Sequence, residues 1–146
     1  MSKMVRDAMT SQPVTIEPSA SVKSAAELMA RQDIGSLPVV DEHGSLVGML
    51  TDRDIAIRAV AAGRDADATE VNEILTSPTV QVIPEDPLDV ALELMAKYQV
   101  RRLPVVYDTQ LVGVLAQADI AHEAKDKQAG QLLEAISQPA PEHAQA

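Results

Sequence analysis

The chain contains one unit of sequence written twice. Residues 10–40 align without a gap with residues 76–106, at an offset of 66 positions. After a deletion of one residue, residues 46–56 align with residues 111–121. The runs ELMA and LPVV occur at the same place in both copies. A repeated sequence predicts repeated structural units that bury apolar surface against each other, so this duplication constrains the fold more than any other feature.

Each copy carries the same order of hydrophobic patterns. An alternation that ends at a proline predicts a short strand, an apolar stripe at helical spacing predicts a helix, and two apolar runs joined by a turn predict a hairpin. A second helix closes each copy. The predicted ranges are 14–16, 22–29, 37–40, 46–50 and 52–62 in the first copy, and 80–82, 88–95, 103–106, 111–115 and 117–125 in the second. The helical stripes consist of Val22, Ala25, Ala26 and Met29, and of Leu88, Ala91, Leu92 and Met95.

These elements predict the fold class and the domain boundaries. We expect an α/β (α+β) chain in which each copy forms a small three-stranded sheet with two helices. A sheet of that size leaves one face in need of cover, which the other copy can provide. The predicted ranges are 5–62 for the first domain, 63–70 for a linker, 71–127 for the second domain, and 128–146 for a C-terminal helical turn and a frayed tail.

Charge and composition argue against several classes of function. Twelve Lys and Arg against 22 Asp and Glu give a net charge of −10, which opposes the phosphate backbone of nucleic acids. Tyr98 and Tyr107 are the only aromatic residues and offer little stacking surface. Without cysteine, and with three scattered histidines, we expect no metal site and no catalytic nucleophile. The absence of a long apolar run predicts a cytoplasmic protein outside the membrane.

A seven-residue motif follows the hairpin of the first copy. Residues 48–54 read GMLTDRD, a GhhTxxD pattern in which h is a hydrophobic residue. A duplicated unit with an LPVV strand and this motif resembles the CBS domain pair, or Bateman module, and more narrowly its stand-alone bacterial members. The resemblance covers residues 5–125. It implies tandem CBS domains packed about a pseudo-two-fold axis, with clefts for adenosyl ligands such as AMP, ADP, ATP or S-adenosylmethionine.

The motif residues suit the parts of such a ligand. Backbone N–H groups at the start of the second helix favour a phosphate, and Thr51 can donate its hydroxyl proton. Asp54 can accept hydrogen bonds from the ribose 2′ and 3′ hydroxyls. Arg53 either lies near the phosphates or is a solvated surface residue. The resemblance implies that adenine beside Asp54 contacts Ile83, Leu88, Val100 and Arg101.

The same motif has a structural interpretation that needs no ligand. Thr51 and Asp54 have the spacing of a helix N-cap and its third residue, close to a capping box. A capping box fixes the start of a helix by reciprocal hydrogen bonds between these two positions. Both interpretations can hold at once.

The second copy departs from the motif. Residues 113–119 read GVLAQAD, so Asp119 is kept while Ala116 replaces the threonine. We therefore expect a second and weaker site at Asp119. Arg101 and Arg102 either neutralise phosphates or form salt bridges with surface acids. The resemblance implies a second set of contacts beside Asp119, namely Glu17, Val22, Ile34 and Gly35, with Arg102 added for its charge.

Two hypotheses of function follow. In the first, the chain is a non-enzymatic sensor or regulatory module that requires no cofactor and binds an adenosyl ligand. It then forms a homodimer and acts in trans on an effector protein, since no effector domain is present in the sequence. In the second, the chain is a structural or interaction protein with the CBS fold that binds no nucleotide. Neither hypothesis involves a nucleic acid or a membrane partner.

Overall fold

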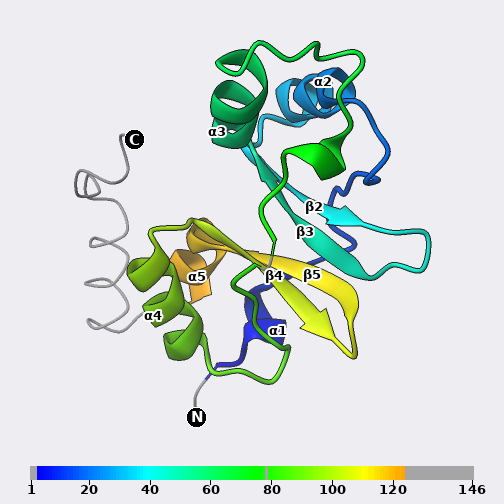
Figure 1. Cartoon of the computed structure of the whole chain (residues 1–146). Coiled ribbons are helices and arrows are strands. Elements are labelled where there is room, and N and C mark those ends of the chain that lie inside the picture. The colour runs from blue at the N-terminus through cyan, green and yellow to red at the C-terminus, as the bar shows by residue number, and fades with distance from the viewer. Residues whose placement is uncertain (1–2, 78, 124–146) are drawn as a thin grey trace. The chain divides into compact units, whose positions relative to one another are not determined.

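The computed structural model describes residues 3–77 and 79–123, which form two compact units (Figure 1). Among the described residues, the first-repeat unit contains 13–77, 79 and 108–111. The second-repeat unit contains 3–12, 80–107 and 112–123. Each unit has a hydrophobic core of its own.

The helices and strands follow the same order in both copies of the sequence. The first-repeat unit contains α2 (Val22–Gln32), β2 (Ser36–Val40), β3 (Leu46–Thr51), α3 (Asp52–Asp54), the π-helix η1 (Ile55–Val60) and the 3-10 helix η2 (Val71–Glu73). The other elements are α1 (Val5–Ala8), β1 (Thr10–Ser11), α4 (Leu88–Tyr98), β4 (Arg102–Tyr107), β5 (Gln110–Ala116) and α5 (Gln117–Glu123). The predicted class, an α/β chain with small sheets and helices, is confirmed.

The sheet of the first-repeat unit is built around the β2–β3 hairpin. These strands are antiparallel, with Leu37 opposite Leu50. A parallel bridge joins Ile16 to β2, and an antiparallel bridge joins Thr76 to β3. The predicted strand 14–16 is therefore a single bridged residue, which is a correction. Ile16 makes both bonds of the bridge, and Pro18 lacks the N–H group that would continue the pairing two residues further on.

The sheet of the second-repeat unit repeats this arrangement. Its strand order is β1-β5-β4, and Thr10 of β1 lies opposite Val114 of β5. A parallel bridge joins Val82 to Val105, so the predicted strand 80–82 is also reduced to one bridge. Both sheets thus contain the same hairpin, with a short segment along each edge.

The short helix that leads into each copy packs in the unit of the other copy. Residues 3–8 pair with the segment before α4, and residues 69–73 pair with the segment before α2. The equivalent hydrogen bonds are Val5 N–H to Asp86 O (2.8 Å) and Leu88 N–H to Lys3 O (3.0 Å), and Val71 N–H to Ala20 O (2.8 Å) and Val22 N–H to Thr69 O (2.9 Å). The compact units therefore differ from the sequence copies by an exchange of these lead-in segments.

The buried faces of the two long helices follow most of the predicted stripes. In α4, all four predicted residues are buried. In α2, three of the four are buried, whereas Ala26 is exposed, so the prediction for Ala26 was wrong. Leu28 packs partly against this core and shifts the apolar face away from Ala26. Met29 and Met95 both lie in the cores, as predicted.

The second helix of the first copy changes its hydrogen bonding after one turn. The predicted helix 52–62 begins as α3 and continues as η1, where Ala61 N–H donates to Ala56 O at 2.9 Å. The predicted helix 117–125 is seen as α5, and residues 124–125 and the predicted tail 128–146 lie outside the described residues. Within residues 3–77 and 79–123, no helix is long and apolar enough to cross a membrane.

Candidate functional site

The GhhTxxD motif forms the junction between β3 and α3. Thr51 ends the strand in an extended conformation and is the N-cap of the helix. Its hydroxyl oxygen accepts a hydrogen bond from the Asp54 N–H at 3.0 Å, and its own N–H donates to Asp54 Oδ2 at 3.0 Å. The predicted capping box is therefore confirmed. It uses the Thr51 oxygen only as an acceptor, so the hydroxyl proton remains available to another group.

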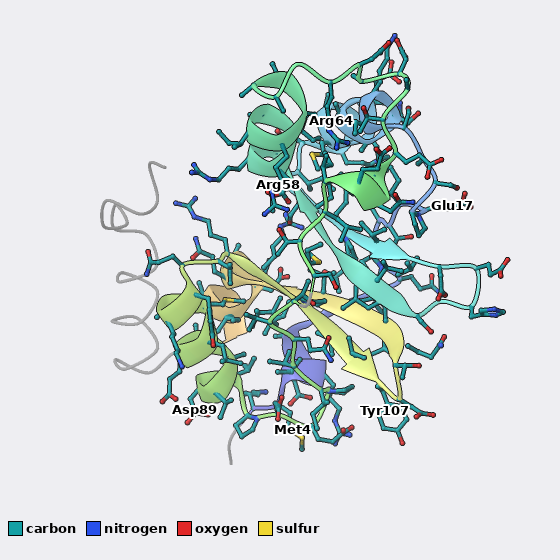
Figure 2. The ribbon with its side chains drawn as sticks, in the orientation of Figure 1. Met4, Glu17, Arg58, Arg64, Asp89 and Tyr107 are labelled. Carbon is teal, nitrogen blue, oxygen red and sulfur yellow. The ribbon has the colours of Figure 1, made fainter. Side chains whose placement is uncertain are left out.

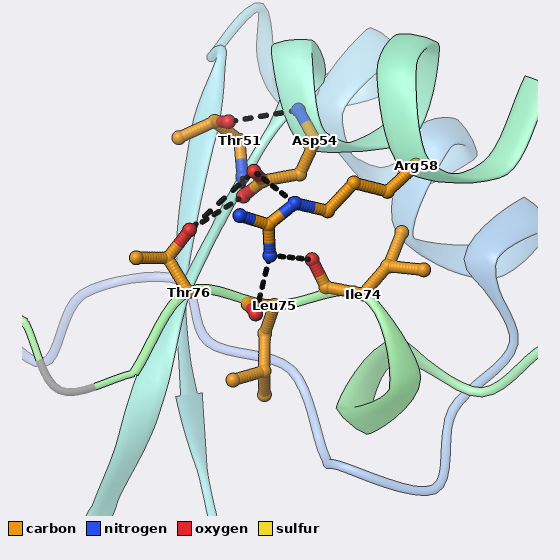
Figure 3. Close-up of polar contacts among 6 residues, drawn as sticks. All are labelled: Thr51, Asp54, Arg58, Ile74, Leu75 and Thr76. Carbon is orange, nitrogen blue, oxygen red and sulfur yellow. Dashed lines mark hydrogen bonds and ion pairs between the residues drawn. The ribbon is translucent and has the colours of Figure 1, made fainter. Parts of the chain in front are cut away.

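Asp54 also contacts residues that lie outside the motif (Figure 3). The Thr76 hydroxyl donates to Asp54 at 3.4 Å from Oδ1 and 3.5 Å from Oδ2. Arg58, one turn further along the helix, places Nε 3.9 Å from Asp54 Oδ1. Asp54 is only 8 % exposed. Its carboxylate is thus held by Thr51, Thr76 and Arg58. From the sequence we had predicted only the capping contact and a bound ribose for Asp54.

Arg58 connects the helix after β3 with the chain segment that follows η2. Its Nη1 donates to Ile74 O at 3.2 Å and to Leu75 O at 3.1 Å. Arg64 also reaches this part of the chain, because its Nη1 lies 3.0 Å from Glu73 Oε1. Figure 2 labels both arginines. Sequence reasoning missed Arg58 and Thr76. The spacing of four residues between Asp54 and Arg58 was the available signal for an ion pair on one helix face.

Gly48, the first residue of the motif, permits this segment to approach β3. A Cβ atom at position 48 would lie 2.6 Å from Thr76 O and 2.8 Å from Leu75 Cδ1. The backbones of Met49 and Thr76 are consequently paired by hydrogen bonds of 3.0 and 2.9 Å. The glycine of the motif is therefore required by close packing, and this packing brings Thr76 to the Asp54 carboxylate.

A hydrogen bond between Glu70 and Glu73 orders η2, the short helix that precedes residues 74–76. Glu73 Oε2 accepts from the Glu70 N–H at 2.7 Å. This bond, with the hydrogen bond and charge of Arg64, lowers the pKa of the exposed Glu73 carboxyl below its usual value of 4.5. The ionised form of Glu73 therefore stabilises η2.

The junction between β5 and α5 has an equivalent backbone hydrogen bond and different side chains. Gln117 N–H donates to Arg101 O at 2.9 Å, as Asp52 N–H donates to Gly35 O at 2.9 Å in the first-repeat unit. Ala116 cannot form the reciprocal cap that Thr51 forms. Among the described residues, the Oε1 atom of Gln117 is buried without a hydrogen-bond partner. The repeat alignment places Glu123 at the position of Arg58.

The remaining predicted site residues are divided between the two units. In the second-repeat unit, Arg101 is exposed, Ile83 is 47 % exposed, Val100 and Arg102 are half-buried, and Leu88 is 5 % exposed within the core. In the first-repeat unit, Arg53, Glu17 and Gly35 are exposed, Ile34 is half-buried, and Val22 is 1 % exposed. The structure brings Thr51 and Asp54 together. The adenine contacts draw on both units and stay a prediction.

The family of this chain is decided by comparison with known proteins. The sequence profile of the CBS domain matches residues 5–60 and again residues 71–126. The chain belongs to the CBS domain family. The predicted resemblance, including its tandem arrangement, is therefore confirmed.

Two curated CBS relatives match over nearly their whole length. The chain is 44 % identical over 134 residues to the CBS domain-containing protein YhcV of Bacillus subtilis, covering 91 % of this chain and 94 % of YhcV. It is 34 % identical over 134 residues to Hypoxic response protein 1 of Mycobacterium tuberculosis, covering 92 % of this chain and 94 % of that protein. The narrower resemblance to stand-alone CBS pair proteins is thus also confirmed.

Solved structures of CBS proteins share the fold. The crystal structure of Hypoxic Response Protein I with two coordinated zinc ions has a TM-score of 0.79 and covers 84 % of this chain and 100 % of that one. Residues 3–77 and 79–123 of the present chain bring together no three His, Cys, Asp or Glu side chains suited to a metal. The CBS domain pair of protein MJ0100, solved with 5′-methylthioadenosine and S-adenosyl-L-methionine, is 32 % identical, has a TM-score of 0.74, and covers 84 % of this chain and 96 % of that one.

Proposed function

We propose that this CBS domain pair is a cytoplasmic, non-enzymatic regulatory module that binds an adenosyl ligand beside Asp54. The observation that carries the proposal is the MJ0100 CBS pair, a homologue of the same fold solved with two adenosyl compounds. AMP, ADP, ATP and S-adenosylmethionine are the candidate ligands. No cofactor is needed for this role.

The β3–α3 junction can supply the polar contacts of such a ligand. Asp54 Oδ2 accepts from Thr51 N–H, while among residues 3–77 and 79–123 the polar contacts of Oδ1 are the long ones to Thr76 and Arg58. A ribose hydroxyl that donates to Oδ1 at about 2.7 Å forms a stronger bond than either of these contacts. The free proton of the Thr51 hydroxyl and the exposed Arg53 then serve the phosphates, where the ligand has them.

The adenine contacts are aliphatic in this proposal. Ile83, Leu88, Val100 and the backbone of Arg101 would contact adenine at the Asp54 site. No aromatic side chain contributes stacking, so we expect a dissociation constant of about 1 μM or weaker. At the second site, Asp119 would hold the ribose, and Glu17, Val22, Ile34 and Gly35 would contact the adenine. Arg102 would neutralise phosphates there, and the loss of the threonine hydroxyl at Ala116 makes this site weaker.

We propose that the module acts as a homodimer on a separate effector protein. The support for action in trans is that YhcV and Hypoxic response protein 1 match over 94 % of their own length, and neither is named as an enzyme. Ile57 and Val60, which are exposed on η1, offer apolar surface for self-association. Light scattering after size-exclusion chromatography measures the oligomeric state and would give a monomer mass if the dimer is wrong.

A CBS-fold interaction protein that binds no nucleotide is the second candidate. The capping box favours it, because Thr51 and Asp54 satisfy each other without a ligand. Thermal unfolding with AMP, ATP, S-adenosylmethionine and 5′-methylthioadenosine separates the two candidates. A ligand present at 100 times its dissociation constant adds about 2.7 kcal/mol to the free energy of unfolding and raises the melting temperature.

The matched control for this experiment is Asp54→Asn, which keeps the size of the side chain. We expect the ligand-dependent shift of the melting temperature to disappear in this variant. If no compound shifts the wild-type protein, the interaction protein is the better account. If Asp54→Asn keeps the full shift, a ligand binds elsewhere and the proposed site is wrong.

A further inference from the structure

Two side chains link the Asp54 carboxylate to residues 74–76. We call these residues the exit segment, because they lie close to where the chain leaves the first-repeat unit. Arg58 lies beside Asp54 Oδ1 and donates to the carbonyls of Ile74 and Leu75. Thr76 donates its hydroxyl to Asp54 and pairs its backbone with Met49. The same few atoms therefore hold both the carboxylate and the exit segment (Figure 3).

Arg58 and Thr76 do more than attach residues 74–76 to the first-repeat unit, because they also contact the Asp54 carboxylate. The hydrogen bonds of Thr76 N–H to Met49 O at 2.9 Å and Leu75 N–H to Val71 O at 3.1 Å already attach the backbone of this segment. In addition, the Thr76 hydroxyl and Nε of Arg58 face a carboxylate that is 8 % exposed and already capped by Thr51. A carboxylate fixed from three directions does not have to be ordered when a ligand binds, which lowers the entropic cost of binding.

We propose that Arg58 and Thr76 are positioning residues for Asp54, and that they couple ligand occupancy at Asp54 to the ordering of residues 74–76. This inference rests on the proposed function, because it places the ribose of the ligand on Asp54. Coupling between two sites is reciprocal, so a ligand that fixes the carboxylate also steadies the segment attached to it. Ligand binding at Asp54 then changes the ordering of residues 74–76, which lead into the second copy.

The best probe is 5′-methylthioadenosine, because it carries the ribose diol and no phosphate. Any effect of Arg58 on its binding therefore cannot come from an ion pair with a phosphate. We would measure its dissociation constant by calorimetry for the wild type, Arg58→Gln and Thr76→Val. AMP serves as the phosphate-bearing comparison.

Two controls are matched to these variants. Arg64→Gln removes a second arginine that bonds to the same part of the chain, through Glu73, without contacting Asp54. Thr76→Ser keeps the hydroxyl that Thr76→Val removes. We expect Arg58→Gln to weaken 5′-methylthioadenosine by about two- to fivefold, the effect of one partly exposed ion pair at 3.9 Å. Thr76→Val should weaken it by a smaller factor, and both controls should bind as the wild type does.

Hydrogen exchange supplies a second readout that a purely structural role would not move. In the wild type, 5′-methylthioadenosine should slow exchange of the Leu75 and Thr76 amides, and this protection should be lost in Arg58→Gln. In the ligand-free protein, Asp54→Asn should speed exchange of the same amides about as much as Arg58→Gln does. The double variant should add little to either.

Three results would overturn the inference. Arg58→Gln could bind 5′-methylthioadenosine as the wild type does, or it could weaken AMP alone, which would make Arg58 a direct phosphate contact. Asp54→Asn could also leave exchange at Leu75 and Thr76 unchanged. If the wild type binds none of the adenosyl probes, the proposed function fails separately, and the ligand-free exchange of Asp54→Asn still decides whether the carboxylate and the exit segment are linked.

Discussion

The β3–α3 and β5–α5 junctions have equivalent glycines and backbone hydrogen bonds but different polar side chains. Each begins with a glycine that admits a neighbouring segment, and each places the first helical N–H on a carbonyl at 2.9 Å. The first-repeat junction adds Thr51 and Arg58 around its aspartate, whereas the second has alanine and glutamate at the corresponding positions. The comparison shows that the duplicated backbone is independent of the polar groups that make Asp54 a candidate site.

The largest expected effect tests the shared backbone. Gly48→Ala places a Cβ against the Thr76 carbonyl, and overpacking of this kind costs about 1–3 kcal/mol. Gly113→Ala should be destabilising too but cost less, because the backbone oxygen nearest to its Cβ, Thr10 O, lies at 2.9 Å and the other close atom is the sulfur of the flexible Met9 side chain at 2.8 Å. Urea unfolding of both variants measures the two free energies.

Gly35→Ala is the control for this pair, because its Cβ meets only the movable Asp52 side chain. We expect it to change stability least of the three. A Gly48→Ala variant as stable as the wild type would show that the exit segment does not pack on β3 as described.

An intermediate effect tests the difference between the caps. Thr51→Ala removes the N-cap of α3 and should lower the free energy of unfolding by about 1 kcal/mol. Ala116→Thr supplies α5 with the missing cap opposite Asp119 and should raise it by about 0.5–1 kcal/mol. Thermal and urea unfolding measure both changes. Destabilisation by Ala116→Thr would mean that the second junction cannot accept the geometry of the first.

The smallest expected effect concerns the lead-in helices. Asp7 and Glu73 each accept a hydrogen bond from the N–H three residues earlier, at 2.8 and 2.7 Å. Because the pKa of Glu73 is lowered in the folded state, its contribution is present above its usual pKa of 4.5 and is lost as the pH falls through the folded value. Glu73→Gln should therefore be slightly less stable than the wild type at neutral pH, and this difference should shrink in acid. A difference that stays constant from about pH 7 to about pH 3 would contradict the ionic contribution of Glu73.

Much of the fold could be predicted from the sequence because its signals are local. Hydrophobic spacing located both long helices and both hairpins, and the repeat alignment showed that they recur. Ala26 was assigned wrongly because its small side chain can lie at the edge of an apolar face without being buried. The exchange of the lead-in helices could not be predicted, since the two copies of that helix are similar and spacing does not indicate which unit each one joins.

The candidate site was predicted only in part for a similar reason. Thr51 and Asp54 lie three residues apart, so helix geometry alone predicted their reciprocal hydrogen bonds. Thr76 lies 22 positions from Asp54 and reaches it only because the exit segment packs across Gly48. Such a contact depends on tertiary structure, and no periodic pattern in the sequence indicates it.

Calorimetric titration of adenosyl ligands into Asp54→Asn and Asp119→Asn tests the central claim most directly. The account predicts that the tighter binding component of the wild type is lost in Asp54→Asn and kept in Asp119→Asn. Equal losses in the two variants would show that the side-chain differences between the junctions do not set affinity. Loss in Asp119→Asn alone would contradict the account, because it would place the main site at the junction that lacks the threonine and the arginine.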